Sequence, residues 1–291
     1  MCDNGLIGGL FINMDIKKTI RRNDFHFNKR FGQNFIEDTT LLNKIVDFAL
    51  VTHDDSVLEI GVGAGTLTKV LSERAKKVVG YEIDKNLQPV LSETLSGVEN
   101  AEVVFRDFMR ESTEEINRAF DEDFIVVANL PYYITSPVTM RLLEEFPGCK
   151  RIVIMVQKEV AERFTAKSGT KDYGSITASI DYYGDAVYGF TVDRTNFYPV
   201  PNVDSAVVKI DRRKKYDAKS ETAFKQIVSI AFLARRKTLV NNMIANLSIS
   251  RSVAEDLLTS LNIDVNVRGE VLSAEKFVEL SNLLVDKKIL K

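Results

Sequence analysis

The sequence has few of the residues that build disulfide frameworks and metal centres. Its 291 residues include two cysteines, two histidines and no tryptophan. Cys2 and Cys149 are too few for a disulfide framework, and His26 and His53 stand alone, so no metal-ligand set is present. We therefore predict that the protein has no metal site and works in a reducing compartment, the cytoplasm.

Long apolar runs are also missing. No window approaches the 18 consecutive apolar residues of a membrane-spanning helix, so we expect no membrane association. The apolar patch from Leu6 to Ile12 lacks the basic flank and the small-residue cleavage site of a signal peptide. We expect residues 1–28 to form an N-terminal extension that is partly disordered.

Charge is unevenly spread, although the net charge is only −2. Residues 209–237 carry ten Lys or Arg against three acids, and six bases cluster in residues 17–30. Residues 80–125 carry twelve acids against four bases. A local basic surface attracts polyphosphate whatever the total charge. The distribution favours a nucleic-acid partner, with ordinary solvated surface as the alternative.

Apolar runs alternate with helical patterns through the middle of the chain. We predict strands at 56–60, 77–83, 102–105, 124–129 and 151–157, separated by helices, and two more at 186–192 and 206–210. Strands that alternate with helices form a doubly wound parallel sheet. The last two strands would add an antiparallel hairpin at one edge.

The pattern becomes wholly helical after Asp211. Residues 220–247 and 253–261 show helical periodicity, and Ser273 opens a last helix. The polar stretch 212–220 is the expected boundary. We therefore predict an α/β domain over residues 29–214 and a small all-helical domain over residues 215–291.

A glycine-rich turn follows the first strand of the sheet. Gly61, Gly63 and Gly65 lie where a strand meets a helix, and their missing side chains let a ligand approach the backbone. Glu82 ends the next strand, where a carboxylate can accept from both ribose hydroxyls. Asp107 is placed to accept from an adenine amine, with a helix N-cap as the alternative. NAD enzymes and S-adenosylmethionine enzymes share these features.

The tetrapeptide Asn129-Leu130-Pro131-Tyr132 follows the fourth predicted strand, at the sheet edge where ligands bind. The Asn129 side-chain oxygen and the Leu130 carbonyl would accept from an exocyclic amine and free its delocalised lone pair. Pro131 stiffens the turn, and Tyr132 offers a face for a base. With the glycine turn, the tetrapeptide predicts methyl transfer from S-adenosylmethionine to an amino group, that of adenine in a nucleic acid.

These motifs resemble those of the small-subunit (16S) ribosomal RNA adenine dimethyltransferases, the family whose loss gives kasugamycin resistance. The resemblance runs from about Asn28 to the C-terminus and includes residues 29–35, 82–84, 156–161, 197–207, 235–239 and 268–273. It implies a Rossmann-like class I S-adenosylmethionine-dependent methyltransferase sheet with a C-terminal RNA-binding domain. It also implies dimethylation of two adjacent adenines in a hairpin loop near the 3′ end of 16S rRNA, in the 30S particle, and a role in small-subunit biogenesis.

The resemblance also assigns roles to individual residues. S-adenosylmethionine would be bound by Asn34, Ile36, Gly61, Gly63, Glu82, Asp107 and Asn129. The target adenine would lie between Tyr132 and Phe197, beside the catalytic residues Asn129, Leu130 and Pro131. Tyr133 departs from the family, in which many members carry Asn at this position. The departure affects which contacts the pocket makes with the target base, not the reaction itself.

The basic run near the C-terminus supplies a candidate RNA site. We predict Arg235, Arg236 and Lys237 on a helix whose apolar side includes Ile230, Phe232 and Leu239, where they would bind RNA phosphates. Solvent-facing residues, or partners of local acids, are the alternative. We expect the protein to be a monomer.

Three other functions stay open. The 23S rRNA adenine methyltransferases of the macrolide-resistance type share the catalytic fold, but Arg235–Leu239 and Arg268–Ser273 match the 16S family. A mainly non-catalytic ribosome-assembly factor would keep the RNA-binding surface, and the intact Asn129 and Tyr132 argue against it. DNA adenine methyltransferases usually carry Asp/Asn-Pro-Pro-Tyr and a target-recognition domain, for which this chain has little room.

Overall fold

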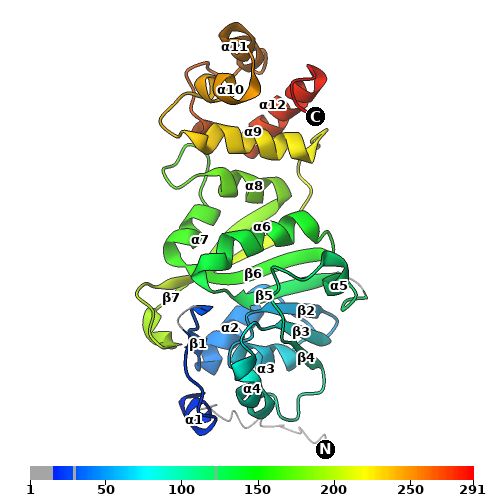
Figure 1. Ribbon diagram of the computed structural model, residues 1–291, viewed down its shortest axis with the longest axis vertical. Helices are drawn as coiled ribbons and strands as arrows, with labels where there is room; N and C mark the ends of the chain where they lie inside the picture. The colour runs from blue at the N-terminus through cyan, green and yellow to red at the C-terminus, as the bar shows by residue number, and fades with distance from the viewer. Residues whose placement is uncertain (1–15, 29–30, 122) are drawn as a thin grey trace, which may run out of the picture.

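The structure is a computed structural model that describes residues 16–28, 31–121 and 123–291. Figure 1 shows an elongated molecule in which a central sheet separates a helical C-terminal end from the end that carries α1 (Ile16–Arg22). Most of the predicted N-terminal extension, residues 1–15, lies outside the described residues.

A seven-stranded sheet forms the centre, with the order β4-β3-β2-β5-β6-β9-β7. Its strands are β2 (Ser56–Ile60), β3 (Lys77–Tyr81), β4 (Ala101–Val104), β5 (Phe124–Asn129), β6 (Cys149–Gln157), β7 (Gly184–Val192) and β9 (Ser205–Arg212). The first five in this order are parallel, whereas β9 is antiparallel to both β6 and β7. The predicted parallel sheet with an antiparallel hairpin at one edge is confirmed. Its order reverses between β2 and β5, the point at which such sheets bind ligands.

Helices cover both faces of this sheet (Figure 1). On one face lie α2 (Thr39–Ala49) and α3 (Thr66–Ser72), and on the other lie α5 (Thr113–Asn117), α6 (Thr135–Glu145), α7 (Lys158–Phe164) and α8 (Ser175–Tyr183). Within β5, Val126 and Ala128 face the α6 side, while Ile125 and Val127 face the α2 side. Both faces are buried, which is why this strand reads as one continuous apolar run.

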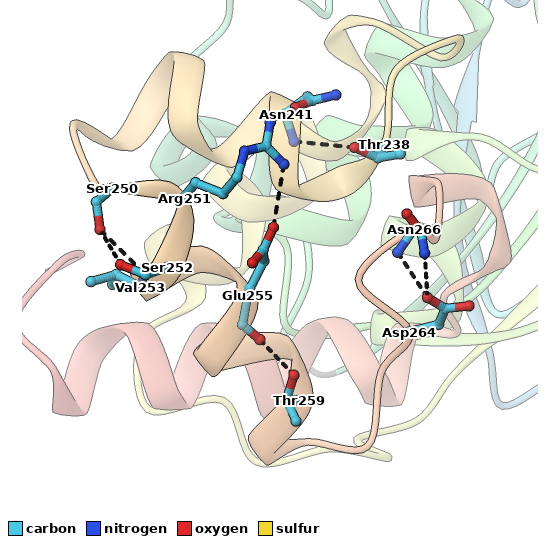
Figure 2. A network of polar contacts seen from close by, with 10 residues as sticks. All are labelled: Thr238, Asn241, Ser250, Arg251, Ser252, Val253, Glu255, Thr259, Asp264 and Asn266. Carbon is cyan, nitrogen blue, oxygen red and sulfur yellow. Dashed lines mark hydrogen bonds and ion pairs between the residues drawn. The ribbon is translucent and has the colours of Figure 1, made fainter.

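The C-terminal helices α9 (Glu221–Leu233), α10 (Leu239–Leu247), α11 (Arg251–Ser260) and α12 (Ala274–Asp286) share a second apolar core. Figure 2 shows how polar contacts order this region: the Thr238 and Ser250 hydroxyls cap α10 and α11. Arg251 joins these two helices, because its Nη2 donates to Asn241 Oδ1 over 2.7 Å. The core also includes Tyr173 and Ala178, so these helices pack directly on α8.

The prediction that Arg235, Arg236 and Lys237 lie on a helix was wrong. The chain leaves the helical conformation after Leu233, and Arg235, Arg236 and Lys237 lie in the turn between α9 and α10. Buried Asn242 stabilises this break, since its Nδ2 donates to the carbonyls of Ala231 and Ala234. The side-chain donor replaces helical N–H groups that would have bonded those carbonyls.

The N-terminal side of the molecule holds elements that the sequence patterns did not predict. Ile16 and Ile20 of α1 are buried against α4 (Gln88–Thr94), so residues 16–22 of the expected extension form a packed helix. A second sheet of two short strands pairs β1 (Phe35–Ile36) antiparallel with β8 (Phe197–Tyr198). No helix among the described residues is long and apolar enough to cross a membrane.

Candidate active site

A cavity opens at the carboxyl ends of β2, β3 and β5, where the sheet order reverses. Its wall includes ten residues that the sequence pointed to: Asn34, Ile36, Gly61, Gly63, Glu82, Asp107, Asn129, Leu130, Pro131 and Tyr132. These come from segments nearly 100 residues apart in the chain. The structure thus brings together every predicted cofactor and catalytic residue except Phe197.

The glycine turn and the Asn-Leu-Pro-Tyr turn lie against each other. Gly61 has a φ of +79°, and a Cβ on it would lie 3.6 Å from Pro131 Cδ and 3.7 Å from the Asn129 carbonyl oxygen. A Cβ on Gly63, whose φ is +58°, would lie 3.0 Å from the ring of Phe35. Both glycines adopt a left-handed backbone that other residues rarely adopt, and at Gly63 a side chain would also press on the ring of Phe35.

Glu82 is held rigidly at the end of β3. Its carboxylate accepts from two backbone N–H groups, Gly63 N to Oε2 and Asp84 N to Oε1, each over 2.8 Å. Burial raises the pKa of Glu82, and these two donors oppose that rise. Each oxygen keeps a further lone pair. A pair of ligand hydroxyls can therefore bind to a carboxylate that is already positioned.

Glu59 is a second buried carboxyl group in the cavity wall, and the sequence reasoning missed it. It is 1% exposed on β2, and its Oε2 accepts from the Thr68 hydroxyl over 2.6 Å. Burial, with a smaller contribution from the charge of Glu82, raises the pKa of Glu59 to about 8. The signal was a carboxylate inside the apolar run of residues 56–60.

Asp107 lies in the cavity wall, three residues after the end of β4. Its Oδ1 accepts from Met109 N over 2.9 Å, and its Oδ2 lies 3.4 Å from Arg110 Nε. The alternative interpretation as a helix N-cap is wrong, because Ser112 caps α5. The Asp107 carboxylate instead closes a tight turn beside the cavity.

Asn129 and Asn34 are linked across the cavity wall. The Asn129 Nδ2 donates to the Asn34 carbonyl over 3.0 Å, and the Asn34 Nδ2 donates to the Gly32 carbonyl over 3.1 Å. With its nitrogen engaged by the protein, Asn129 has its Oδ1 available to accept from a ligand. The link also ties segment 32–34 to the end of β5.

The two aromatic residues predicted to hold the target base lie in different surroundings. The Tyr132 hydroxyl shares a 3.0 Å hydrogen bond with Ser205 Oγ, a fully buried group at the start of β9, and burial raises the Tyr132 pKa. Phe197 is 4% exposed and packs in the core beneath α2, outside the cavity wall. Its backbone pairs with Ile36, which does line the cavity. A stacking role for Phe197 stays a prediction.

The predicted basic run divides into two parts. Six of its bases between residues 209 and 225 are paired with acids: Lys209, Arg213, Lys214, Lys215, Lys219 and Lys225. Within the described part of the chain, Arg235, Arg236 and Lys237 are exposed and have no ion pair with an acid. Arg235 does donate to the carbonyls of Lys171 and Tyr173, over 2.9 and 3.2 Å. The turn therefore carries charge that its own neighbours do not neutralise.

Comparison with known proteins places this site in a family. A family model described as ribosomal RNA adenine dimethylase matches residues 24–286. The ribosomal RNA small subunit methyltransferase A of Geobacillus sp. (strain WCH70) is 44% identical over 279 residues, which cover 92% of this chain and 95% of that protein. The protein of the same name from Bacillus cereus (strain B4264) is 44% identical over 281 residues, covering 94% and 96%.

Two solved structures resemble most of the chain. A dimethyladenosine transferase from Plasmodium falciparum superposes with a TM-score of 0.77 at 27% identity, covering 87% of this chain and 98% of that one. The 23S rRNA methyltransferase ErmE superposes with a TM-score of 0.66 at 28% identity, covering 86% and 99%. The chain therefore belongs to the ribosomal RNA adenine dimethylase family, and it is an S-adenosylmethionine-dependent methyltransferase that acts on adenine in ribosomal RNA.

Proposed function

We propose that the protein dimethylates two adjacent adenines in a hairpin loop near the 3′ end of 16S rRNA, within the 30S subunit or its precursor. It would act as a cytoplasmic monomer in small-subunit biogenesis. The observation that carries the proposal is the meeting of Glu82, Gly61 and Asn129 at one cavity. The 44% identity to two small subunit methyltransferases, against 28% to a 23S enzyme, supports the small-subunit target.

The cavity residues fit a nucleoside cofactor that carries a positive sulfur. S-adenosylmethionine supplies a methyl group that is open to attack by a nucleophile. The Glu82 carboxylate would accept from the ribose hydroxyls, and Asp107 would accept from the adenine amine of the cofactor. The left-handed glycines at 61 and 63 would let the cofactor approach the backbone of the turn.

The residues at the end of β5 would prepare the target amine. Asn129 Oδ1 and the Leu130 carbonyl accept from its two N–H groups, which draws the nitrogen toward tetrahedral geometry and frees its lone pair. Tyr132, fixed through Ser205, holds the ring of the base. Attack on a methyl group needs no prior deprotonation, and the proton leaves afterwards. After the first transfer one N–H remains for the same acceptors, so the arrangement can serve a second transfer. Orientation supplies most of the rate.

Transfer of labelled methyl groups tests the proposal. The purified protein is given labelled S-adenosylmethionine and, separately, naked 16S RNA, naked 23S RNA and immature 30S particles that lack the modification. We expect the 30S particles to be the best acceptor, with the label on two neighbouring adenines as dimethyladenine. Better transfer to 23S RNA, or label on a single nucleotide, would contradict the proposal.

A further inference from the structure

Arg141 of α6 carries a charged group that is almost entirely shielded from solvent. Its side chain is 10% exposed. Its Nη1 donates to the Phe108 carbonyl, and its Nη2 donates to the Glu111 carbonyl over 2.5 Å. Its Nε donates to the Glu145 carboxylate, one turn further along α6, over 2.9 Å. A buried charge needs partners, and Arg141 finds two of these three in the backbone of a single loop.

That loop carries Asp107, the residue proposed to accept from the adenine amine of the cofactor. It joins β4 to α5, and its residues 105–112 form neither helix nor strand. Two bonds inside the loop run to the Asp107 carbonyl, from Arg110 N over 2.9 Å and from Glu111 N over 3.2 Å. Arg141 adds two bonds from outside. Its planar fork donates to both carbonyls at once, which fixes the loop relative to α6.

Aromatic packing holds the Arg141 guanidinium in place. Its central carbon lies 5.0 Å from the ring centroid of Phe108 and 5.7 Å from that of Phe146, and these two rings stack with centroids 6.0 Å apart. Val138, one turn earlier on α6, lines the cavity, whereas Arg141 lies outside the cavity wall. Arg141 can therefore act on a bound cofactor only through the residues that it holds.

Selective recognition of an amine depends on a fixed acceptor, because a hydrogen bond weakens steeply when its angle or length changes. We infer that Arg141 is a positioning residue that makes the cofactor site selective for adenine. By holding the carbonyls of Phe108 and Glu111, it sets the Asp107 carboxylate where the 6-amino group would bind. The inference rests on the role of Asp107 in the proposed function and deepens it, since it names what gives that residue its place.

The test compares two ligands by calorimetric titration. One is S-adenosylhomocysteine, the product that remains after methyl transfer, and the other is its analogue with purine in place of adenine, which lacks only the 6-amino group. The proteins are the wild type, Arg141→Met, Arg141→Lys, Asp107→Ala and the double variant of Asp107→Ala with Arg141→Met. Glu145→Gln is the matched control, because it removes the charge opposite Arg141 Nε and leaves both carbonyl contacts in place.

We expect the wild type to bind S-adenosylhomocysteine about tenfold to a hundredfold more tightly than the purine analogue, the value of one hydrogen bond to a charged group. Arg141→Met should lower this ratio by about fivefold or more, with little change for the analogue. Arg141→Lys should lower it as well, because one amine cannot reproduce the fork. Glu145→Gln should match the wild type. In the Asp107→Ala background, Arg141→Met should leave the ratio unchanged.

An equal loss of affinity for both ligands in Arg141→Met, with the ratio preserved, would show that Arg141 only supports the fold and would overturn the assignment. A further fall of the ratio in the Asp107→Ala background would also overturn it, since Arg141 would then act by another route. If Arg141→Met does not fold, Arg141→Lys decides by the same criteria.

The same titrations separate this inference from the function on which it rests. If Asp107→Ala keeps the ratio of the wild type, the proposed role of Asp107 is removed, and the assignment of Arg141 with it. If Asp107→Ala lowers the ratio and the Arg141 variants do not, only the assignment of Arg141 fails. None of these measurements uses RNA, so transfer to 30S particles tests the proposed target independently.

Discussion

Glu82 and Glu59 lie on neighbouring strands beneath the glycine turn, and their surroundings treat the two carboxyl groups differently. Burial raises the pKa of both groups. Two backbone N–H groups bind the Glu82 carboxylate and oppose the rise, whereas Glu59 has the hydroxyl of Thr68 and a pKa of about 8. The backbone donors therefore favour Glu82 as the charged member of the pair, the group that faces the ribose in the proposed complex.

The role of Glu82 can be measured directly. We expect Glu82→Ala to weaken S-adenosylmethionine binding by about 1.5–3 kcal/mol, the range for hydrogen bonds to a charged group. Glu82→Gln keeps the size of the side chain and separates the loss of charge from the loss of packing. Calorimetric titration of the three proteins gives the affinities, and an unchanged value for Glu82→Ala would remove Glu82 from the site.

Glu59 should make the unliganded protein less stable as the pH rises. Its pKa is about 8 in the folded state and near 4.5 in the unfolded chain, so its contribution is full below pH 4.5. Between these values the unfolded state loses its proton first, and the free energy of unfolding falls by about 1.4 kcal/mol per pH unit. Urea unfolding at pH 6 and pH 9 measures the fall. Glu59→Gln should reduce it, and the same fall in wild type and Glu59→Gln would refute the assignment.

Replacing Asn129 should lower the rate of methyl transfer far more than it lowers the affinity for RNA. Loss of one positioned acceptor costs on the order of 10²-fold in rate, while the basic turn that would hold the RNA lies in another part of the molecule. We expect single-turnover methylation by Asn129→Ala to fall by at least about that factor, with RNA affinity nearly unchanged. Because Asn129 also donates to the Asn34 carbonyl, cofactor affinity is measured in parallel. Normal methylation by the variant would exclude the proposed role.

Among the elements, the turn between α9 and α10 shows where sequence reasoning reaches its limit. Apolar residues recur at helical spacing on both sides of the turn, and no Gly or Pro interrupts residues 231–241. The break depends on Asn242, whose amide reaches back to the carbonyls at the end of α9, and on the Thr238 cap. Thr238 alone was a readable signal, as a potential N-cap. The hydrogen bonds of Asn242 join two different helices, and the periodicity of apolar residues along the sequence does not reveal such bonds.

The turn should contribute to the salt dependence of RNA binding. Arg235 bonds to two carbonyls of the α7–α8 loop, so Arg236→Gln with Lys237→Gln tests the charges and leaves that contact in place. We expect the log–log slope of affinity against salt to flatten by about 1.5–2 units, the effect of two lost phosphate contacts. Lys214→Gln, which removes a base already paired with Asp217, is the control. A slope equal to that of the wild type would mean that the RNA is held elsewhere.

The sheet was predictable because its strands are buried on both faces, and burial leaves a continuous apolar run in the sequence. The glycine turn, Glu82 and Asn129 were predictable because each follows such a run, and the ends of parallel strands meet at one edge. The place of Phe197 in the fold was not predictable, since β8 is only two residues long and depends on its pairing with β1. The hydrogen bond between Ser205 and Tyr132 was not predictable either, because only the fold brings the two residues together.

At the scale of the whole molecule, the helical end is fastened to the sheet through the α7–α8 loop. Arg235 donates to the carbonyls of Lys171 and Tyr173, and Gly169 N donates to the Glu270 carbonyl over 2.7 Å. Tyr173 also packs against Phe232 of α9, with ring centroids 6.0 Å apart. These contacts set the distance between the basic turn and the cavity. In the proposed complex, an RNA would be accepted only if its own fold offers phosphates and an unstacked adenine at that distance.

The pairing of β1 with β8 has a thermodynamic consequence. One strand carries Ile36, which lines the cavity and is predicted to contact the cofactor, and the other carries Phe197, the residue predicted to meet the target base. A ligand that orders either strand orders its partner as well. The two binding equilibria would then share one coupling free energy. If bound cofactor raises the affinity for RNA by some factor, bound RNA must raise the affinity for the cofactor by the same factor.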